Sequence, residues 1–437
     1  MINSLLFKKE KAEIFLGLDI GTEAVKAIIF SFSGKKDKKI TILGNSFSYF
    51  DSYGIFNSKD FEADVIKKTI SKTIEETKSK VNQKPSEAKP SESEDEGKPE
   101  RGKLHRLPSE AKTSEAADET KSQRPPNLTL LGLPANILKG RIVFQSFRRE
   151  NPQSMIIDKK EKEVIYQKIL SKTQKEISQI FARESGILPK DIHFINLKIL
   201  EIKIDGYVVP AIQGYDGKNL DFRILAIFLP KYYLENIKKI IQTFAPGGLE
   251  ILNLAEVLPY FFRNRVADGI FLDVGGNLTQ IFLVNNGKLN KVDEFQIGGE
   301  TFSQTLSQSL GLEISEARAL KENYSKGELS EEGVRKRVRE IFSQSLEEWF
   351  KNLKLKLKTH SLLPSTFFLF GGGSQLPEIQ EILEEGDWEG FSFFTPPKVK
   401  FIYPKDFRNI EDITKKLNSP QDVPLLLIAN YYDQENF

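Results

Sequence analysis

Two short segments, each an acid followed closely by glycine, constrain the fold of this chain more than any other feature of its sequence. They are Asp-Ile-Gly-Thr at residues 19–22 and Asp-Val-Gly-Gly at residues 273–276. An apolar run precedes each segment, and a second run rich in β-branched and aromatic residues follows it. We therefore predict that each segment is the turn of a strand–turn–strand hairpin. Such a turn offers backbone N–H groups to phosphate oxygens, while the acid is free to hold a metal ion or a water. Two of these hairpins, one in each half of the chain, could hold one nucleotide from both sides.

A third glycine cluster, Gly371-Gly372-Gly373-Ser374, follows a predicted buried strand at 367–370 and precedes a predicted helix at 378–384. The sequence has no G-x-x-x-x-G-K-[ST] segment, which excludes a P-loop protein. It also has no G-x-G-x-x-G after its first predicted strand, which argues against a dinucleotide-binding fold. The phosphate-binding signal of this chain therefore consists of the two hairpin turns and the later glycine cluster.

With these three motifs in this order, nearly the whole chain resembles the actin-like ATPase superfamily. The resemblance implies an α/β fold of two lobes, of the actin-like (ribonuclease H-like) type, with an inserted α+β subdomain. It also implies that ATP and Mg²⁺ are the cofactors, with the metal ion near Asp19 and Asp273. The residues that the resemblance assigns to cofactor binding are Asp19, Gly21, Thr22, Lys26, Gly275, Gly276, Asn277, Thr279, Gly298, Gly299, Lys321, Gly371, Gly372, Gly373 and Ser374.

The 437 residues divide into four predicted parts. Residues 1–77 form the N-terminal part of the first lobe, and residues 255–437 form the second lobe with the second hairpin and the glycine cluster. Residues 78–126 are poor in large apolar side chains and rich in Lys, Glu, Ser and Pro, which predicts a disordered low-complexity insertion. This insertion is either a tethered docking segment or a tolerated surface insertion. Residues 127–254 have the pattern of a small α+β unit.

The 127–254 unit resembles the subdomain that the cell-division actin homologue FtsA carries, chiefly through an Asp-Gly…Pro…Gly…Gly…Leu series at 205–220. The segments 296–302 and 316–324 are similar to the Ile-Gly-Gly turn and the Ala-Glu-x-x-Lys nucleoside motif of the same family. Resemblance to FtsA implies a protein that links the division machinery to the membrane, with the tubulin-like FtsZ as its partner and with possible self-polymerisation.

Several residues depart from the FtsA pattern. Arg318 replaces the acid of the nucleoside motif and cannot accept a hydrogen bond from a ribose hydroxyl. Gln280 replaces the acid expected after Thr279. We therefore expect nucleotide binding with at most slow hydrolysis, and Glu256 is the candidate for the catalytic role of orienting the attacking water. A sugar kinase of the same superfamily would need a catalytic Asp on a substrate hydroxyl, and the sequence offers no convincing candidate.

Two residues resemble PilM instead, the type IV pilus scaffold of the same superfamily: Lys26, seven residues after Asp19, and Asn277. FtsA proteins also normally end in an amphipathic membrane helix, and only five residues follow the last predicted helix, at 421–432. The alternative function is therefore that of a PilM-like cytoplasmic scaffold, which grips the cytoplasmic tail of a pilus-assembly membrane protein.

Composition limits the remaining classes of partner. A net charge of +2 gives no overall attraction to nucleic acid. No apolar run reaches the ~20 residues of a membrane span, and no secretory signal precedes residue 14. Residues 1–11 combine apolar side chains with lysines, so they form either a weak membrane contact or a frayed tail. We predict a cytoplasmic protein, peripheral to the inner face of the cell membrane, which reaches that membrane through a partner or through the weak N-terminal contact.

Overall fold

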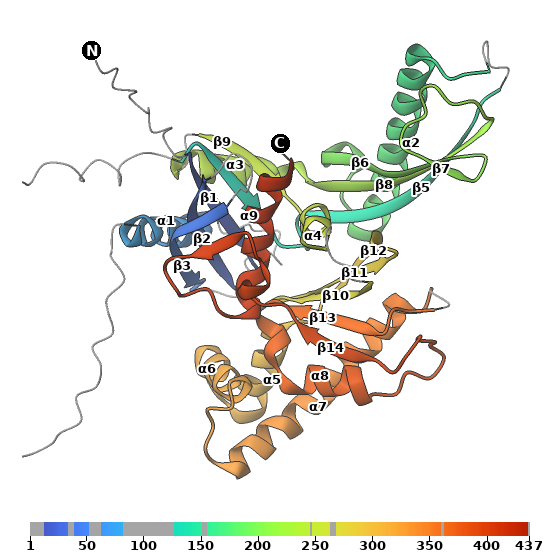
Figure 1. The fold of residues 1–437 in the computed structure, drawn as a ribbon. Helices are drawn as coiled ribbons and strands as arrows, with labels where there is room; N and C mark the ends of the chain where they lie inside the picture. Colours follow the sequence, from blue (N-terminus) through green and yellow to red (C-terminus); the bar gives the residue numbers. More distant parts are fainter. Residues whose placement is uncertain are drawn as a thin grey trace, which may run out of the picture.

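The computed structural model describes residues 13–33, 39–51, 63–81, 126–150, 155–244, 247–262, 268–359 and 362–435. Figure 1 shows two lobes, one above the other, and a smaller subdomain that projects to one side. Most of the predicted insertion at 78–126 lies outside the described residues, and so does the segment 1–11.

The first lobe is built on a six-stranded sheet in the order β15-β3-β2-β1-β4-β9. Neighbouring strands among β1, β2 and β3 are antiparallel, whereas β4, β9 and β15 join the sheet in parallel. Helix α1 packs against β2 and β3, and α9 packs against β1 and β4, so the sheet is buried on both faces. The elements of this lobe are β1 (Ile14–Ile20), β2 (Ala24–Ser33), β3 (Lys39–Tyr49), β4 (Leu128–Gly132), β9 (Gly248–Leu252), β15 (Ile410–Asp412), α1 (Ala63–Lys80), α3 (Lys231–Phe244), α4 (Leu254–Phe262) and α9 (Val423–Glu435).

The second lobe repeats the same local order of strands. Its five-stranded sheet runs β12-β11-β10-β13-β14, with an antiparallel meander β10–β11–β12 and with β13 parallel to β10, as β4 is parallel to β1. Its core gathers around the fully buried side chains of Trp349, Phe302 and Phe342. The elements are β10 (Gly269–Val274), β11 (Thr279–Asn285), β12 (Lys288–Phe295), β13 (Thr366–Phe370), β14 (Lys398–Phe401), α5 (Gly299–Leu310), α6 (Ile314–Ser325), α7 (Glu332–Leu357) and α8 (Pro377–Glu385).

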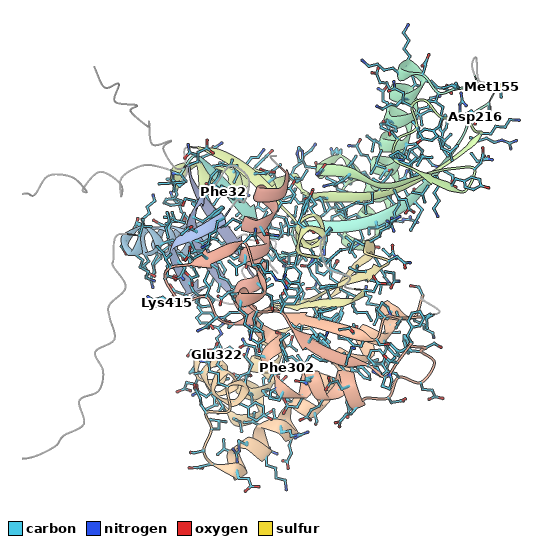
Figure 2. All side chains as sticks on the ribbon, viewed as in Figure 1. Phe32, Met155, Asp216, Phe302, Glu322 and Lys415 are labelled. Atoms are coloured by element: carbon cyan, nitrogen blue, oxygen red, sulfur yellow. The ribbon has the colours of Figure 1, made fainter. Side chains whose placement is uncertain are left out.

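The small subdomain has its own four-stranded sheet, β5-β8-β6-β7, covered on one face by helix α2. The start of α2 is capped by Asp158, whose carboxylate accepts a hydrogen bond from the N–H of Glu161 at 2.8 Å, and Gly186 ends the helix at a φ of 73°. Met155 and Asp216 lie at the end farthest from the lobes (Figure 2). The elements are β5 (Lys139–Arg148), α2 (Lys159–Ser185), β6 (Ile192–Ile204), β7 (Tyr207–Val209) and β8 (Asn219–Pro230).

Two predicted boundaries differ from the structure. The unit predicted at 127–254 begins and ends with β4 and β9, which pair in the sheet of the first lobe, so the sheet of the subdomain itself lies between 139 and 230. The second lobe predicted at 255–437 loses α4, β15 and α9 to the first lobe. The apolar run at 423–429 is buried almost completely there, because it fills the space beside β1, β4 and α4. Figure 1 shows this red C-terminal helix beside the blue N-terminal strands.

A buried ion cluster ties the small subdomain to the second lobe. Glu294 of β12 accepts hydrogen bonds from Lys139 at 2.8 Å and from both terminal nitrogens of Arg141 at 2.5 and 2.7 Å. Burial alone would raise the pKa of Glu294, but the hydrogen bonds and charges of Arg141 and Lys139 outweigh it and hold that pKa at about 2. The subdomain is therefore attached covalently to one lobe and electrostatically to the other.

In the described part of the chain, no helix is both long and apolar enough to cross a membrane.

Candidate functional site

A cavity of about 500 Å³ lies where the two lobes meet, which is within the size range of small-molecule sites. Both hairpin turns and the glycine cluster line it, so the structure brings together the three motifs that the sequence separates. The predicted site residues in its wall are Asp19, Gly21, Thr22, Lys26, Asp273, Gly275, Gly276, Lys321, Gly371, Gly372 and Gly373.

The two hairpin turns have the same local hydrogen bond and touch each other. In the first, the N–H of Gly21 donates to the carbonyl of Ala24 at 2.8 Å, and in the second, the N–H of Gly275 donates to the carbonyl of Leu278 at 2.9 Å. The N–H of Asn277 then donates to the hydroxyl of Thr22 across the lobes at 3.0 Å. Asn277 itself is outside the cavity wall, so its contribution is to join the turns.

Gly276 is a glycine because the first turn approaches it closely. A Cβ at this position would lie 2.5 Å from Cγ of Glu23 and 2.6 Å from Oγ1 of Thr22. Such distances are not compatible with a side chain, so any other residue would force the two turns apart. The glycine thus sets the spacing of the two lobes at the site.

Lys26 and the two acids form the polar end of the cavity. The ammonium of Lys26 donates to Oδ2 of Asp19 at 3.2 Å and to the carbonyl of Gln421 at 2.7 Å, so it bridges the first hairpin and the start of the last helix. Burial raises the pKa of Asp273 to about 7, with Lys26 lowering it and the charge of Asp19 raising it further. A cation bound beside Asp273 would favour the ionised form of this carboxyl group.

The donor set fits a magnesium ion. Mg²⁺ is commonly held by one or two carboxylates, with phosphate oxygens and waters completing the octahedron. Asp19 and Asp273 supply two carboxylates at one end of the cavity. Among the described residues no group of three or more His, Cys, Asp or Glu side chains could hold a metal ion.

Gly298 and Gly299 lie behind the second turn and not in the cavity wall. At the start of α5, the N–H groups of Gly299 and Glu300 donate to the carbonyls of Gly275 and Gly276 at 2.8 and 2.7 Å. A Cβ on Gly298 would lie 2.4 Å from the carbonyl oxygen of Gly276. These glycines therefore shape the second turn by close backbone packing.

Two hydroxyls predicted to bind the cofactor are turned inward. Thr279 is fully buried, donates to the carbonyl of Ile297 at 2.8 Å and accepts from the indole of Trp349 at 2.9 Å. Ser374 is also fully buried and donates to the carbonyl of Gly371 at 2.7 Å. Both hydroxyls stabilise the strands and turns around the site, because the O–H donor of each is used within the protein.

Glu256 is also outside the cavity wall. It lies in the first turn of α4, is 4% exposed, and accepts a hydrogen bond from the side-chain amide of Asn196 in β6 at 2.6 Å. Burial raises its pKa, against the lowering effect of Asn196. In this structure Glu256 joins the first lobe to the small subdomain through Asn196, and its role in orienting the attacking water stays a prediction.

The glycine cluster contains two different kinds of glycine. Gly371 has a φ of +87°, and a Cβ there would lie 2.3 Å from Oδ1 of Asp273, so both its backbone and its surroundings demand glycine. Gly372 has nothing closer than Cβ of Gln421 at 3.8 Å, so it has room for a small side chain beside the cavity.

Lys321 is buried, and its ammonium donates to the carbonyl of Gly299 at 2.7 Å. Burial lowers the pKa of this lysine, and the charges of Glu23 and Glu322 oppose that effect. Lys321 thus joins α6 to the start of α5 while it lines the cavity.

Sequence reasoning missed several residues of the cavity wall: Glu23, Phe47, Tyr49, Glu322 and Lys326. Tyr49 of β3 donates its hydroxyl to Glu322 of α6 at 2.5 Å, across the two lobes. The guanidinium of Arg318 lies 4.4 Å from the centre of the Tyr49 ring and 4.0 Å from the carboxylate of Glu23. Glu23, which follows Thr22 directly, and Glu322, which follows Lys321 directly, lay close enough to a motif to be found from the sequence.

Comparison with known proteins agrees with this geometry. The family model described as cell division protein FtsA matches residues 270–421, which hold the second hairpin, α6 and the glycine cluster. The cell division protein FtsA of Enterococcus hirae is 24% identical over 285 residues, or 58% of this chain and 60% of that relative. The chain thus matches less than two thirds of the length of that curated relative.

Among solved structures, the PilM–PilN type IV pilus biogenesis complex is similar with a TM-score of 0.57 at 14% identity, covering 95% of this chain and 97% of that one. At this identity the similarity concerns the fold. The chain thus resembles FtsA over part of its sequence and has an actin-like ATPase fold, similar to that of the PilM–PilN complex.

Proposed function

We propose that this protein is an FtsA-like scaffold that binds ATP with Mg²⁺ between its lobes and links the cell-division machinery to the membrane. The observation that carries the proposal is that two glycine turns and a third glycine cluster from distant parts of the chain line one cavity of about 500 Å³. The match to FtsA covers the segment that supplies two of these three motifs.

The residues suggest how the nucleotide would be held. The backbone N–H groups of Thr22 and Gly276, the residues that follow the N–H donors closing each turn, would bind phosphate oxygens, and Lys26 would add a positive charge. Asp19 and Asp273 would hold the magnesium ion, which neutralises phosphate charge when bound. The cluster at 371–373 would lie against the adenosine, where the lack of side chains leaves space.

Hydrolysis should be slow. Gln280 lines the cavity at the position where the family has an acid, and an amide can orient a water but cannot take its proton. Because Glu256 is bonded to Asn196 in this structure, we expect steady-state turnover without a partner well below the ~10 s⁻¹ that is typical of enzymes. An enzyme-like rate from the purified protein alone would contradict this expectation.

Calorimetry tests the nucleotide site. We expect ATP to bind the full chain in the presence of Mg²⁺ and to bind much more weakly in EDTA. Asp273→Asn should remove most of the dependence on Mg²⁺. Asp293→Asn is the matched control, because Asp293 lies outside the cavity wall and accepts a hydrogen bond from Lys356 at 2.9 Å. A folded wild-type protein that shows no Mg²⁺-dependent binding of ATP would refute the proposal.

The partner would be the tubulin-like division protein FtsZ, and the protein would act in the cytoplasm at the inner face of the cell membrane, with possible self-polymerisation. This part of the proposal rests on the likeness to FtsA alone. Co-sedimentation with polymers of FtsZ, dependent on ATP, is the expected result.

The second candidate is a PilM-like scaffold that grips the cytoplasmic tail of a pilus-assembly membrane protein. It is favoured by the similarity of nearly the whole chain to the PilM–PilN complex and by Lys26, which bridges Asp19 and Gln421. Binding of such a tail peptide, together with no co-sedimentation with FtsZ, would decide for this alternative.

A further inference from the structure

A cluster of five charged side chains spans the boundary between the two lobes. One member belongs to the first hairpin, in the first lobe, and four belong to helices α5 and α6 of the second lobe. This boundary cluster consists of Glu23, Glu300, Arg318, Lys321 and Glu322. Burial lowers the pKa of Lys321, the charges of the three acids raise it, and the charge of Arg318 lowers it further. The other four members therefore all lie within electrostatic reach of this lysine.

Contacts of the boundary cluster hold the lobes together at this edge of the cavity. The guanidinium of Arg318 lies 4.0 Å from the carboxylate of Glu23 and 4.4 Å from the centre of the Tyr49 ring. The hydroxyl of Tyr49, in β3 of the first lobe, donates to Oε1 of Glu322 at 2.5 Å. Burial and the hydrogen bond to Glu322 raise the pKa of Tyr49 far above its ordinary value, so this hydroxyl stays neutral. These contacts are lost if the two lobes separate here (Glu322 is labelled in Figure 2).

Glu300 is the most deeply buried acid of the cluster, with 2% of its surface exposed. Its backbone N–H donates to the carbonyl of Gly276 at 2.7 Å, and Gly276 is also the residue that the side chain of Glu23 contacts. Oε1 of Glu300 accepts a hydrogen bond from the amide of Gln304 at 3.2 Å. Oε2 is buried, and within the described part of the chain no hydrogen bond reaches it. A negative charge on Glu300 is therefore poorly compensated.

The boundary cluster has more acids than cations. If all five groups were ionised, three carboxylates would face two cations, and one buried negative charge would have no counter-charge. One bound proton removes this excess. Burial and the charge of Glu23, from the first lobe, raise the pKa of Glu300 to about 7. Arg318 and Lys321 on α6, and Gln304 on its own helix, oppose this rise. The proton therefore belongs on Glu300.

We propose that Glu300 is a proton-dependent latch between the lobes: its neutral form keeps them together, and its ionised form favours their separation. When Glu300 loses its proton, a second buried negative charge faces Glu23 across the boundary. Separation of the lobes relieves this repulsion and exposes Glu300 to water. The latch also sets how fast a nucleotide enters and leaves the cavity, a consequence that rests on the proposed binding of ATP.

The direction of the pH dependence follows from the raised pKa. In separated lobes Glu300 has its ordinary pKa of 4.5, and in the closed molecule its pKa is about 7. The closed form therefore binds the proton more tightly. Its advantage is complete below pH 4.5 and is lost as the pH rises from 4.5 to 7. Through this group alone, the ratio of open to closed molecules should rise about ten-fold between pH 6 and pH 8.

The test needs no nucleotide. The chain has no cysteine, so Lys72→Cys on α1 and Gln344→Cys on α7 place one dye pair across the two lobes of the full chain. Both positions are exposed. Energy transfer without Mg²⁺ should show that the ratio of open to closed molecules rises about ten-fold more between pH 6 and pH 8 in the wild type than in Glu300→Gln. Asp273, whose pKa is also about 7, is present in both proteins and cancels in this comparison.

Glu378→Gln is the matched control. Glu378 is also a buried glutamate of the second lobe with one oxygen that no hydrogen bond reaches, but its partner Tyr324 lies in the same lobe. This variant should keep the wild-type pH dependence. Glu23→Gln should move the transition to lower pH, because it removes the negative charge that faces Glu300. It carries the test by itself if Glu300→Gln does not fold.

Equal pH dependence in the wild type and in Glu300→Gln, or an unchanged transition in Glu23→Gln, would overturn the inference while ATP binding stands. Release of a fluorescent ATP analogue is measured separately. It should be faster at pH 8 than at pH 6 in the wild type, and this difference should be smaller in Glu300→Gln. A protein that binds no nucleotide but still opens with rising pH would refute the proposed function and keep the latch.

Discussion

The carboxylate of Glu294 should contribute a large part of the stability of this protein. It is 8% exposed and is the shared partner of Lys139 and Arg141, which reach it from the small subdomain. Replacing it with glutamine keeps the shape of the side chain but leaves the buried Lys139 and the partly buried Arg141 without their counter-charge. Glu294→Gln therefore tests how firmly the subdomain is attached to the second lobe.

The expected magnitude follows from the pKa. The pKa of Glu294 falls from its ordinary value of 4.5 to about 2 in the folded protein. This difference corresponds to about 3 kcal/mol in favour of the folded state when the group is ionised in both states. Because the folded pKa is the lower one, the contribution is complete above pH 4.5 and is lost as the pH falls from 4.5 towards 2. Breaking a buried ion pair typically costs about 3–5 kcal/mol, which is the same range.

Chemical denaturation followed by circular dichroism measures this contribution. At pH 7 we expect Glu294→Gln to lower the free energy of unfolding by about 3 kcal/mol, and we expect the gap between wild type and variant to close as the pH approaches 2. Glu381→Gln is the control, because Glu381 pairs with Arg339 on the surface, with both side chains about half exposed. Its effect should stay below ~1 kcal/mol. If Glu294→Gln lowered the free energy of unfolding at pH 7 by no more than Glu381→Gln does, or if its effect did not change with pH, the reasoning would be refuted.

Three further predictions concern other parts of the chain. Gly371→Ala should lower the melting temperature clearly, because residue 371 has a φ of +87° and its Cβ would collide with Asp273. Gly372→Ala should leave the melting temperature nearly unchanged. A bulky residue at 372 should abolish ATP binding in calorimetry. Replacing residues 82–125 by a short Gly/Ser linker should preserve both melting temperature and ATP binding; a large loss of either would show that this segment is part of the folded body. The purified protein should co-sediment weakly at most with anionic liposomes; strong binding that is removed by truncating residues 1–11 would instead identify a membrane anchor.

The two phosphate hairpins and the strand before the glycine cluster could be predicted from the sequence because their signals are local. Alternating and continuous apolar runs on both sides of Asp19 and Asp273 indicate strand, turn and strand without reference to the rest of the chain. The structure confirms both hairpins as antiparallel pairs, β1–β2 and β10–β11. The order of these motifs was enough to indicate the fold.

Pairing between distant strands could not be predicted in this way. β4 and β9 have strand-like sequences, but nothing in them indicates that β4 pairs with β1 and β9 with β4, and not with the sheet of the subdomain. β15 has only three residues and joins the opposite edge of the same sheet. Each of these pairings depends on surfaces that exist only after the lobe has formed.

The sequence also did not show in which direction individual side chains point. Thr279 and Ser374 belong to recognisable motifs, yet their hydroxyls face backbone carbonyls inside the protein. Tyr49 belongs to no motif, yet it lines the cavity because β3 ends beside α6 of the other lobe. A motif predicts which part of the backbone lies close to the ligand. Which side chains line the cavity depends on the contacts between the two lobes.

The return of α9 to the first lobe sets the order in which the protein can be completed during synthesis. Lys26 and its partner Gln421 are 395 positions apart, and the side chains of α9 fill the core that β1 and β4 share. The sheet and helices of the second lobe, by contrast, lie within one stretch from β10 to β14. The first lobe, whose strands are synthesised first, is thus completed last. One apolar face of its sheet is covered only when α9, near the other end of the chain, has been made. A nascent chain halted before Gln421 would have all elements of the second lobe, but the apolar core of its first lobe would still lack α9.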